Sequence, residues 1–263
     1  MKVGIITGSG TYALPGFEDA EARTVDTRFG PAPVTTGTWA GVEVVHVSRH
    51  GEGHRRLSSS VSHQANVLAL KEAGAGCVLA ATVCGALDPE LELGTLVVFD
   101  DLHFLANRLP DGSLCTLYTE PGMPGRGHWI FDRPFAPELR GVLLDAARAA
   151  GHPVRDGGCY GHVDGPRFNT RTEIRMLRQA GVTAVSQTAG PETVLCGEAE
   201  LPYALVGYAT DYANGVPDEP TPVQTLIELI GRSGAVFAGT LRAAVGRVPA
   251  AGPRPVGTHF RFD

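Results

Sequence analysis

Short apolar runs alternate with stretches of helical spacing along most of the chain. Continuous apolar runs are typical of strands that are covered on both faces. Six such runs predict strands at residues 3–7, 42–48, 78–82, 96–99, 184–186 and 204–209. The intervening stretches predict helices at residues 60–73, 137–150, 170–180, 191–199 and 222–248. Strands interleaved with helices favour a single α/β domain, with helices flanking a central sheet.

Glycines mark where several of these helices should end. Gly74, Gly151 and Gly181 each follow the last residue of a helical pattern, which is a common helix stop. The long helix 222–248 is expected to be interrupted between Gly231 and Gly234.

Two segments fit neither pattern. Residues 106–134 are rich in glycine and proline and predict a long irregular loop, a kind of segment that is commonly functional or mobile. The last residues, 249–263, are expected to form a peripheral tail, which leaves 1–248 as the catalytic domain.

Composition limits the classes of partner. The 263 residues are 43% hydrophobic and 19% charged, which suits one globular domain with a large core. A net charge of −6 provides no broad basic surface, so we expect neither nucleic acid nor an anionic membrane as a partner. No apolar run has the length of a membrane span or a secretory leader, and we expect a cytoplasmic protein. The odd number of cysteines, five without a CxxC pair, predicts free buried thiols.

The first candidate motif is Gly8-Ser9-Gly10, directly after a predicted strand. Glycines allow backbone N–H groups to surround an oxyanion, and the same residues could also form a plain tight turn. Together with Ala13 the motif fits the GxGxxA dinucleotide fingerprint as well. That third interpretation needs a helix at the loop, and Pro15-Gly16 would end such a helix after a few residues. We therefore rank a nicotinamide-dependent oxidoreductase last.

Arg49-His50-Gly51 follows the predicted strand 42–48, at the strand end where α/β proteins usually bind ligands. The planar fork of Arg49 suits bidentate contact with phosphate, although an arginine here could also be an ordinary surface residue. His46, His50 and His54 repeat every four residues and raise the alternative of a metal site. That spacing aligns side chains only on a helix, which the glycines here oppose, so we expect no bound metal.

Other catalytic arrangements receive little support. The chain has no GxSxG elbow for a nucleophilic serine. A second arrangement would use Asp164 and Glu192 as an acid and base pair. Single carboxylates near turns and helix starts, however, more often cap helices. We assign them no catalytic role.

Taken in order, the motifs resemble those of the trimeric purine nucleoside phosphorylases, and most closely their 5′-methylthioadenosine phosphorylase branch. The resemblance runs from Lys2 to about Val248. Its carriers are Gly8-Ser9-Gly10, Arg49-His50-Gly51, residues 64–71, residues 82–87, Gly165-Pro166-Arg167-Phe168, Pro191-Glu192 and Ala209-Thr210-Asp211-Tyr212. The resemblance implies the fold of that family, with a twisted mixed β-sheet.

It also implies phosphorolysis, in which inorganic phosphate is a co-substrate and no cofactor takes part. The implied phosphate ligands are Ser9, Arg49, His50, Thr82 and Thr188. The implied base site is Phe168, Asn169 and Asp211, with Asp211, Arg49 and Thr188 as the catalytic set. The implied ribose and 5′ contacts are Val83, Gln187, His128, Val223 and Leu226. The resemblance further implies a homotrimer or a dimer of trimers, in which sites borrow residues across a subunit boundary.

Asp211 is the residue that favours adenine. Relatives that act on 6-oxopurines generally carry Asn at the place of Asp211 and Glu at the place of Asn169, and this chain has neither. A protonated Asp211 could donate to purine N7 while its other oxygen accepts from a 6-amino group. The expected substrate is therefore an adenine nucleoside, most simply 5′-methylthioadenosine.

Three departures from the family pattern keep alternatives open. The segments 106–134 and 214–221 are unusual for the family and would border the 5′ end of the nucleoside, so the 5′ substituent could differ from methylthio. Gln187 stands where a methionine is usual at the ribose contact, and Ala213 stands where adenine-selective relatives often carry a second Asp. The alternatives are a phosphorylase for 6-oxopurine nucleosides such as inosine or methylthioinosine, and a nucleoside-binding module without turnover.

Overall fold

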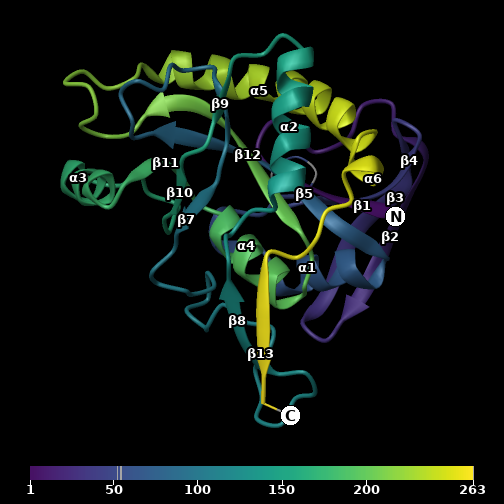
Figure 1. Cartoon of the computed structure of the whole chain (residues 1–263). Coiled ribbons are helices and arrows are strands. Elements are labelled where there is room, and N and C mark those ends of the chain that lie inside the picture. Colours follow the sequence, from purple (N-terminus) through teal and green to yellow (C-terminus); the bar gives the residue numbers. More distant parts are fainter. Residues whose placement is uncertain (52, 54, 263) are drawn as a thin grey trace.

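A mixed β-sheet runs through the centre of the molecule, with helices on both of its faces (Figure 1). The computed structural model describes residues 1–51, 53 and 55–262. The strands of this sheet are β1 (Lys2–Thr7), β2 (Glu18–Thr27), β3 (Gly30–Trp39), β4 (Val42–Ser48), β5 (Ala75–Ala86), β6 (Leu96–Val98), β7 (Asp101–His103), β9 (Val154–Asp156), β10 (Cys159–His162), β11 (Val182–Ser186) and β12 (Tyr203–Tyr212). The helices are η2 (Ser58–Ser60), α1 (His63–Glu72), α2 (Pro137–Ala149), α3 (Arg171–Gln179), α4 (Ala189–Glu198), α5 (Val223–Val245) and α6 (Val248–Ala251). The predicted α/β class with a mixed sheet is confirmed.

Strand β5 is the centre of the sheet. It pairs in parallel with β1 on one side and with β12 on the other, and its last residues pair antiparallel with β11. On the far side of β1 the order continues through β4 and β3 to β2. The parallel strands β1, β4, β5 and β12 therefore end at the same edge of the sheet, which is where ligands bind in such folds.

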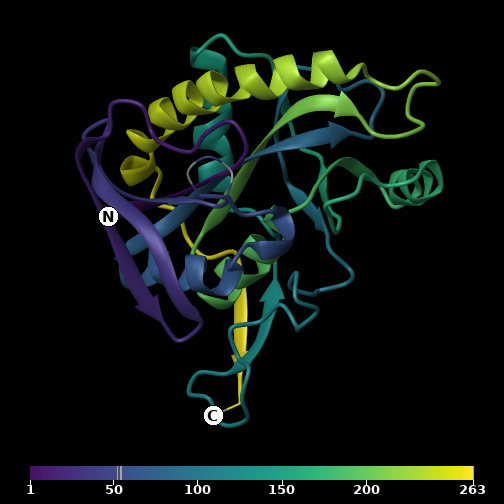
Figure 2. The same ribbon diagram turned by 180° about the vertical axis from the view of Figure 1, so that it is seen from behind.

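Each face of the sheet has its own hydrophobic core. Buried residues of α1 and α4 pack on one face, around Leu70, Leu195 and Phe135. Buried residues of α2, α5 and α6 pack on the other, around Leu143 and Phe237. Helices α2 and α5 lie together on that second face in Figure 1, and the view from behind shows α1 beside β2 and β3 (Figure 2).

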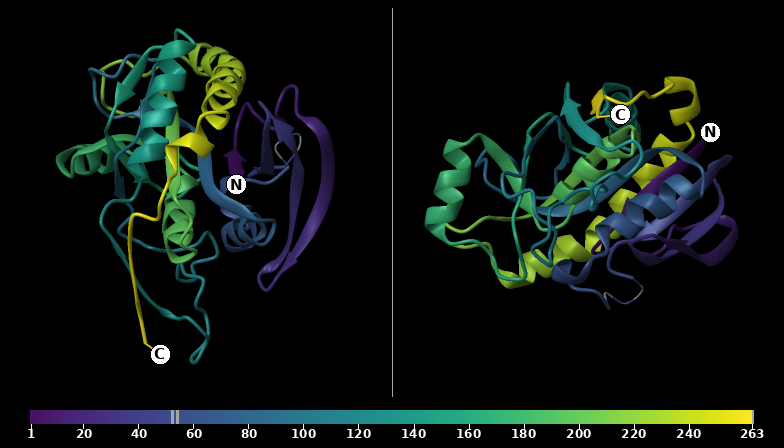
Figure 3. Two further views of the ribbon diagram at one scale, coloured as in Figure 1. Left: turned by 45° about the vertical axis from the view of Figure 1, so that its right-hand side comes forward. Right: turned by 90° about the horizontal axis from the view of Figure 1, so that it is seen from below.

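The chain departs from the sequence-based expectation in the hairpin of β2 and β3. We predicted neither strand. β2 is exposed along nearly its whole length because it is the outer strand, so it lacks the alternation of buried and exposed residues by which strands are recognised. The long curved pair stands at the side of the molecule in Figure 3.

The interruption expected at Gly231 to Gly234 is wrong, because α5 is continuous from Val223 to Val245. A side-chain carbon at Gly234 would collide with the Gly10 carbonyl, so glycine here lets the helix approach the Gly8–Gly10 loop closely. Gly234 therefore serves packing, and neither Gly231 nor Gly234 ends the helix.

The segment 106–134 is only partly irregular. Its residues Gly127–Phe131 form β8, which pairs antiparallel with β13 (Gly257–Arg261) from the segment that we expected to be a peripheral tail. The two strands extend away from the main sheet, and β8 begins where β13 ends, near residue 261 (Figure 1). Closer to the body of the protein, the Glu198 carboxylate accepts hydrogen bonds from the Thr116 hydroxyl and the Leu117 amide, which fixes this segment to α4.

Two expectations about the chain as a whole can be compared with the structure. All five cysteines are free, and four of them are buried, as predicted. Within the described residues, none of the helices combines the length and the apolar character needed to cross a bilayer.

Candidate functional site

A cavity of about 330 Å³ opens at the edge where β1, β4, β5 and β12 end. Its volume is in the range of small-molecule sites. The wall includes eleven of the predicted site residues: Ser9, Arg49, His50, Thr82, Val83, Phe168, Asn169, Gln187, Thr188, Asp211 and Leu226. Residues that are far apart in the sequence are thus brought together as predicted, although their individual roles stay predictions.

The loops after β1 and β4 lie side by side because their strands pair in parallel, with Thr7 opposite Ser48. A Cβ at Gly8 would collide with Nη1 of Arg49, so only glycine lets the first loop rest on the guanidinium. The first loop opens no helix: the chain passes from β1 through turns into β2. The helix that a dinucleotide fingerprint requires is therefore missing from this place.

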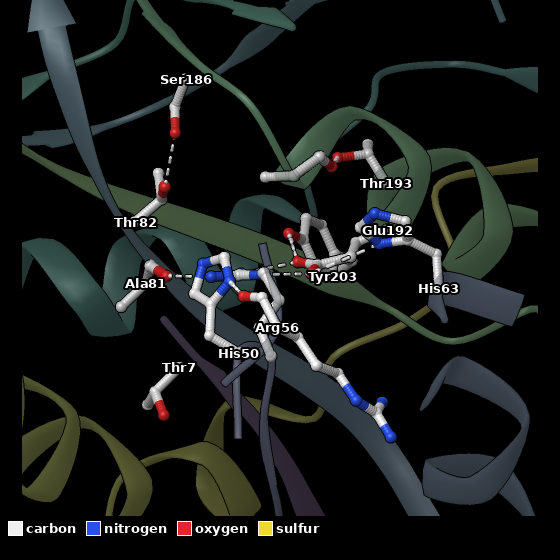
Figure 4. A network of polar contacts seen from close by, with 12 residues as sticks. Thr7, His50, Arg56, His63, Ala81, Thr82, Ser186, Glu192, Thr193 and Tyr203 are labelled. Atoms are coloured by element: carbon white, nitrogen blue, oxygen red, sulfur yellow. Dashed lines mark hydrogen bonds and ion pairs between the residues drawn. The ribbon is translucent and has the colours of Figure 1, made fainter. Parts of the chain in front are cut away.

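Arg49 is fully buried and forms a bidentate ion pair with Glu192. Nε donates to one carboxylate oxygen at 2.5 Å and Nη2 donates to the other at 2.8 Å. Nη1 donates to the Ala81 carbonyl at 3.1 Å, and the Tyr203 hydroxyl donates to Glu192 at 3.2 Å. Figure 4 shows Glu192 with Tyr203 and His63 close beside it. The sequence favours Glu192 as a helix cap. In the structure it is instead the buried counter-ion of Arg49.

This pairing changes what Arg49 can offer an anion. A guanidinium has five N–H donors, and three of them already donate within the protein. Burial by itself lowers the pKa of Arg49, but the Glu192 carboxylate outweighs it, and the net shift is upward. Arg49 is therefore charged, and its Nε and Nη2 face Glu192. Its contact with phosphate stays a prediction and would use the two remaining N–H donors, one on each Nη.

The histidines near Arg49 do not form the repeat expected of a metal site. His46 lies in β4 and shares a hydrogen bond of 2.7 Å with the Thr7 hydroxyl, and burial lowers its pKa to about 4. Nδ1 of His50 lies 2.8 Å from the Arg56 carbonyl, and since a carbonyl only accepts, Nδ1 carries a proton. His54 lies outside the described residues. His46 and His50 thus have separate structural partners.

Hydroxyl groups line the same side of the cavity as His50. The Thr82 and Ser186 hydroxyls are 2.9 Å apart and hydrogen-bonded (Figure 4). Thr188 is the N-cap residue of α4, and its side chain does not cap the helix. The N-terminus of α4 therefore points its partial positive charge toward the cavity wall that contains Thr188, which favours an anion there.

The opposite wall is formed by Phe168 and its neighbours. The ring of Phe168 is 61% exposed, so a flat ligand can stack on it without displacing a neighbour. The loop is held by the start of α3, where Thr170 and Glu173 form a reciprocal capping box and Glu173 also pairs with Arg167. The Asn169 carbonyl accepts a hydrogen bond of 2.7 Å from Asn214, which ties this loop to the segment after β12.

Asp211 faces the cavity because of an irregularity in β12. The pairing register with β5 shifts between Ala209 and Asp211, which places Asp211 opposite Gly85. A bulge of this kind redirects side chains next to functional sites. The Thr210 hydroxyl donates to Oδ1 of Asp211 at 2.9 Å. Burial raises the pKa of the Asp211 carboxyl, and the Thr210 hydrogen bond offsets only part of that rise.

The raised pKa of Asp211 predicts a pH-dependent difference in stability between the wild type and Asp211→Asn. An unfolded Asp ionises near pH 3.9 and the folded one at higher pH, so between these values the folded protein binds more protons and loses stability as pH rises. The amide does not titrate. We expect the free energy of unfolding of Asp211→Asn, relative to wild type, to increase from pH 4 upward in urea titrations. A difference that is independent of pH would contradict the raised pKa.

Two predicted 5′ contacts do not line the cavity of their own chain. Val223 is 70% exposed at the start of α5, outside the cavity wall, whereas Leu226 one turn later lies in it. His128 lies in β8, where it lines a separate groove of about 960 Å³ between the segment 101–134 and α4. Within one copy of the chain, His128 is therefore remote from Asp211.

Several residues of the site were not predicted. Ser58, Ser186, Asn214 and Ile230 line the cavity, and Glu192 lies behind it. Two signals were available: Ser186 immediately precedes the predicted Gln187, and Glu192 belongs to the Pro191-Glu192 motif of the family resemblance. The others come from a short 3₁₀ turn, a loop and a helix face, which have no recognisable motif.

An exposed aromatic side chain, a buried carboxyl and a strand edge rich in hydroxyl groups line one pocket on a mixed α/β sheet, which is the class of site that suits an aromatic ligand beside an oxyanion. Comparison with known proteins then gives the family. The model of the Phosphorylase superfamily matches residues 2–246, and the chain belongs to this superfamily.

The relatives divide into two groups by name. A probable 6-oxopurine nucleoside phosphorylase of Moorella thermoacetica is 33% identical, with 95% of this chain and 94% of the relative covered. An S-methyl-5′-thioadenosine phosphorylase of Bradyrhizobium diazoefficiens is 32% identical, with 99% and 89% covered. Among solved structures, a methylthioadenosine phosphorylase from Schistosoma mansoni in complex with adenine has a TM-score of 0.86 and 31% identity, covering 95% of this chain and 92% of the other.

Proposed function

We propose that this chain is a purine nucleoside phosphorylase that acts on adenine nucleosides, with 5′-methylthioadenosine as the expected substrate. The observation that carries the proposal is the position of Asp211. Its carboxyl lines the same cavity as Phe168 and as Ser9, Thr82 and Thr188 of the anion side, and burial raises its pKa.

The anion side suits inorganic phosphate as the nucleophile. The hydroxyls of Ser9 and Thr188 can each donate to a phosphate oxygen, and the Thr82 hydroxyl can do so once its proton turns away from the Val83 carbonyl. The buried charge of Arg49 lies in the same cavity wall. Phosphate held there attacks the anomeric carbon of the sugar while the bond to purine N9 breaks. The products are a ribose 1-phosphate, with its 5′ substituent retained, and the free base. Positive charge that develops on the sugar is stabilised by the adjacent phosphate.

The base side supplies a proton to the leaving group. As the glycosidic bond breaks, its electron pair moves into the purine ring and makes N7 more basic. Because Thr210 donates to Oδ1, the proton of a neutral Asp211 resides on Oδ2 and can pass to N7. Oδ1 keeps capacity to accept from a 6-amino group, which is the basis for preferring adenine. Asp211 regains its proton from solvent after the base leaves.

This chemistry requires no metal or organic cofactor, since phosphate is the only co-substrate. The partners proposed are therefore a purine nucleoside and phosphate. Free buried thiols suit the reducing cytoplasm, where we place the protein.

The decisive experiment measures release of adenine from methylthioadenosine with and without phosphate. We expect base release to depend on phosphate and to give a stoichiometric sugar 1-phosphate. Equal rates in phosphate-free buffer would indicate a nucleosidase that uses water. Tight nucleoside binding without any phosphate-stimulated product would indicate a binding module without turnover.

A second candidate is a 6-oxopurine nucleoside phosphorylase. It is favoured by Ala213, which is buried next to the base side and offers no second carboxylate for an amino group. It is also favoured by the relatives that carry that name. A panel of adenosine, methylthioadenosine, inosine and methylthioinosine, compared by kcat/KM in phosphate buffer, separates the two candidates.

We further propose a homotrimer, or a dimer of trimers, in which His128 serves the pocket of a neighbouring copy. The exposed apolar rim formed by Phe168, Val223 and Ile227 supports coverage by another subunit. A light-scattering mass close to that of one chain would contradict this arrangement.

A further inference from the structure

The Gln187 carboxamide joins two segments that form opposite parts of the cavity wall. Oε1 accepts a hydrogen bond of 2.9 Å from the Ser58 hydroxyl, and Nε2 donates to the Arg167 carbonyl at 3.3 Å. We call this set the Gln187 bridge (Gln187, Ser58 and Arg167). Ser58 and Gln187 themselves line the cavity, so the bridge is part of its wall.

Each end of the bridge leads to a substrate-facing group. Ser58 closely follows Arg56, whose amide donates to the His50 carbonyl at 2.9 Å and whose own carbonyl accepts from the His50 ring. Arg167 directly precedes Phe168, the stacking platform for the base. The bridge therefore connects the loop that supports the anion side with the loop that supports the base side.

Close packing fixes the orientation of the carboxamide. A Cβ added at Gly165 would collide with the Gln187 carboxamide and would lie 2.7 Å from the Ser58 hydroxyl. Oε1 receives one hydrogen bond and Nε2 gives the other, so a flipped amide would lose the bond to Arg167, because two carbonyl oxygens would then face each other. Methionine, the residue usual here in the family, has the volume of glutamine but no amide donor or carbonyl acceptor.

We propose that Gln187 is a positioning residue that holds the Phe168 loop against the Ser58 turn and thereby sets the affinity for the nucleoside. The proposal rests on the proposed function, and it replaces direct ribose contact as the role of Gln187. The bridge makes no hydrogen bond to His50 or Asp211, and the two Arg56–His50 hydrogen bonds do not depend on it. Its loss should therefore weaken nucleoside binding and leave phosphate binding and the chemical step intact.

A double-mutant cycle tests the bridge through kinetics. Gln187→Met and Ser58→Ala are each expected to raise the KM for nucleoside about 5–10-fold, with kcat and the KM for phosphate within about twofold of wild type. The double variant should resemble the single ones, and Ser58→Thr, which keeps the hydroxyl, should restore most of the affinity. If Gln187→Met lowers kcat while Ser58→Ala has no effect, Gln187 contacts the sugar directly and the proposal is overturned.

A second measurement does not depend on activity. Limited trypsin digestion, followed by mass spectrometry, reports cleavage after Arg167, with cleavage after Arg108 as an internal control on another loop. Both Gln187→Met and Ser58→Ala should speed cleavage after Arg167 several-fold and leave Arg108 unchanged. Unchanged cleavage at Arg167 overturns the bridge even if the wild type catalyses phosphorolysis. Faster cleavage in a protein without phosphorolysis supports the bridge and refutes the proposed function alone.

Discussion

Glu192→Gln is expected to lower the free energy of unfolding by about 3–5 kcal/mol, because it removes one partner of a buried ion pair. The Arg49 charge would remain inside the protein with a neutral amide beside it, and the amide NH₂ cannot accept from the guanidinium. Such a loss is a large share of the roughly 5–15 kcal/mol that holds a typical domain together. Urea unfolding monitored by circular dichroism measures it.

The matched control is Glu200→Gln, which breaks the Arg261–Glu200 ion pair at the surface. Both side chains of that pair are at least 40% exposed, so we expect less than about 1 kcal/mol from it. Arg49→Met combined with Glu192→Leu should recover much of the stability lost in Glu192→Gln, since no unpaired buried charge remains. If Glu192→Gln has the same urea midpoint of unfolding as the wild type, the Arg49–Glu192 pair contributes little to stability.

The second large effect is expected from Asp211→Asn. The amide can still donate to purine N7, but it cannot transfer a proton, so kcat/KM for methylthioadenosine should fall by roughly 10²–10⁴. Its NH₂ group can also donate a hydrogen bond to O6 of a 6-oxopurine. The kcat/KM for hypoxanthine nucleosides should therefore fall much less. The ratio of kcat/KM for methylthioadenosine and methylthioinosine is the measurement.

Asp218→Asn is the control for that substitution. Asp218 is exposed on the segment after β12 and does not line the cavity, so its replacement should leave the ratio unchanged. If Asp211→Asn keeps the wild-type ratio of kcat/KM for methylthioadenosine and methylthioinosine, Asp211 does not take part in base recognition.

Much of the fold could be predicted from hydrophobic pattern, and the failures have physical causes. The buried strands β1, β4 and β12 were recognised because both of their faces are covered, which produces continuous apolar runs. β5 is longer than the predicted strand 78–82, because residues 83–86 also pair with β12 and stay in the sheet. β2 could not be found, because an exposed outer strand buries no face.

For the site, residues that follow strands were predicted well and residues that depend on tertiary pairing were not. Ser9, Thr82 and Asp211 lie where parallel strands end, so the order of the chain predicted their convergence. The partner of Arg49 could not be predicted: Glu192 is far away in the sequence and resembles an ordinary residue of the first turn of a helix. A long-range ion pair has no local signal.

The pairing of β8 with β13 has a consequence for synthesis of the chain. Residues 127–131 are synthesised well over a hundred residues before their strand partner, residues 257–261. Until then the backbone edge beside Trp129 and Phe131 is available to any passing strand. A stop codon placed just before residue 257, or an insertion that displaces residues 257–261, should therefore cause aggregation of newly made protein even though the pocket itself is complete.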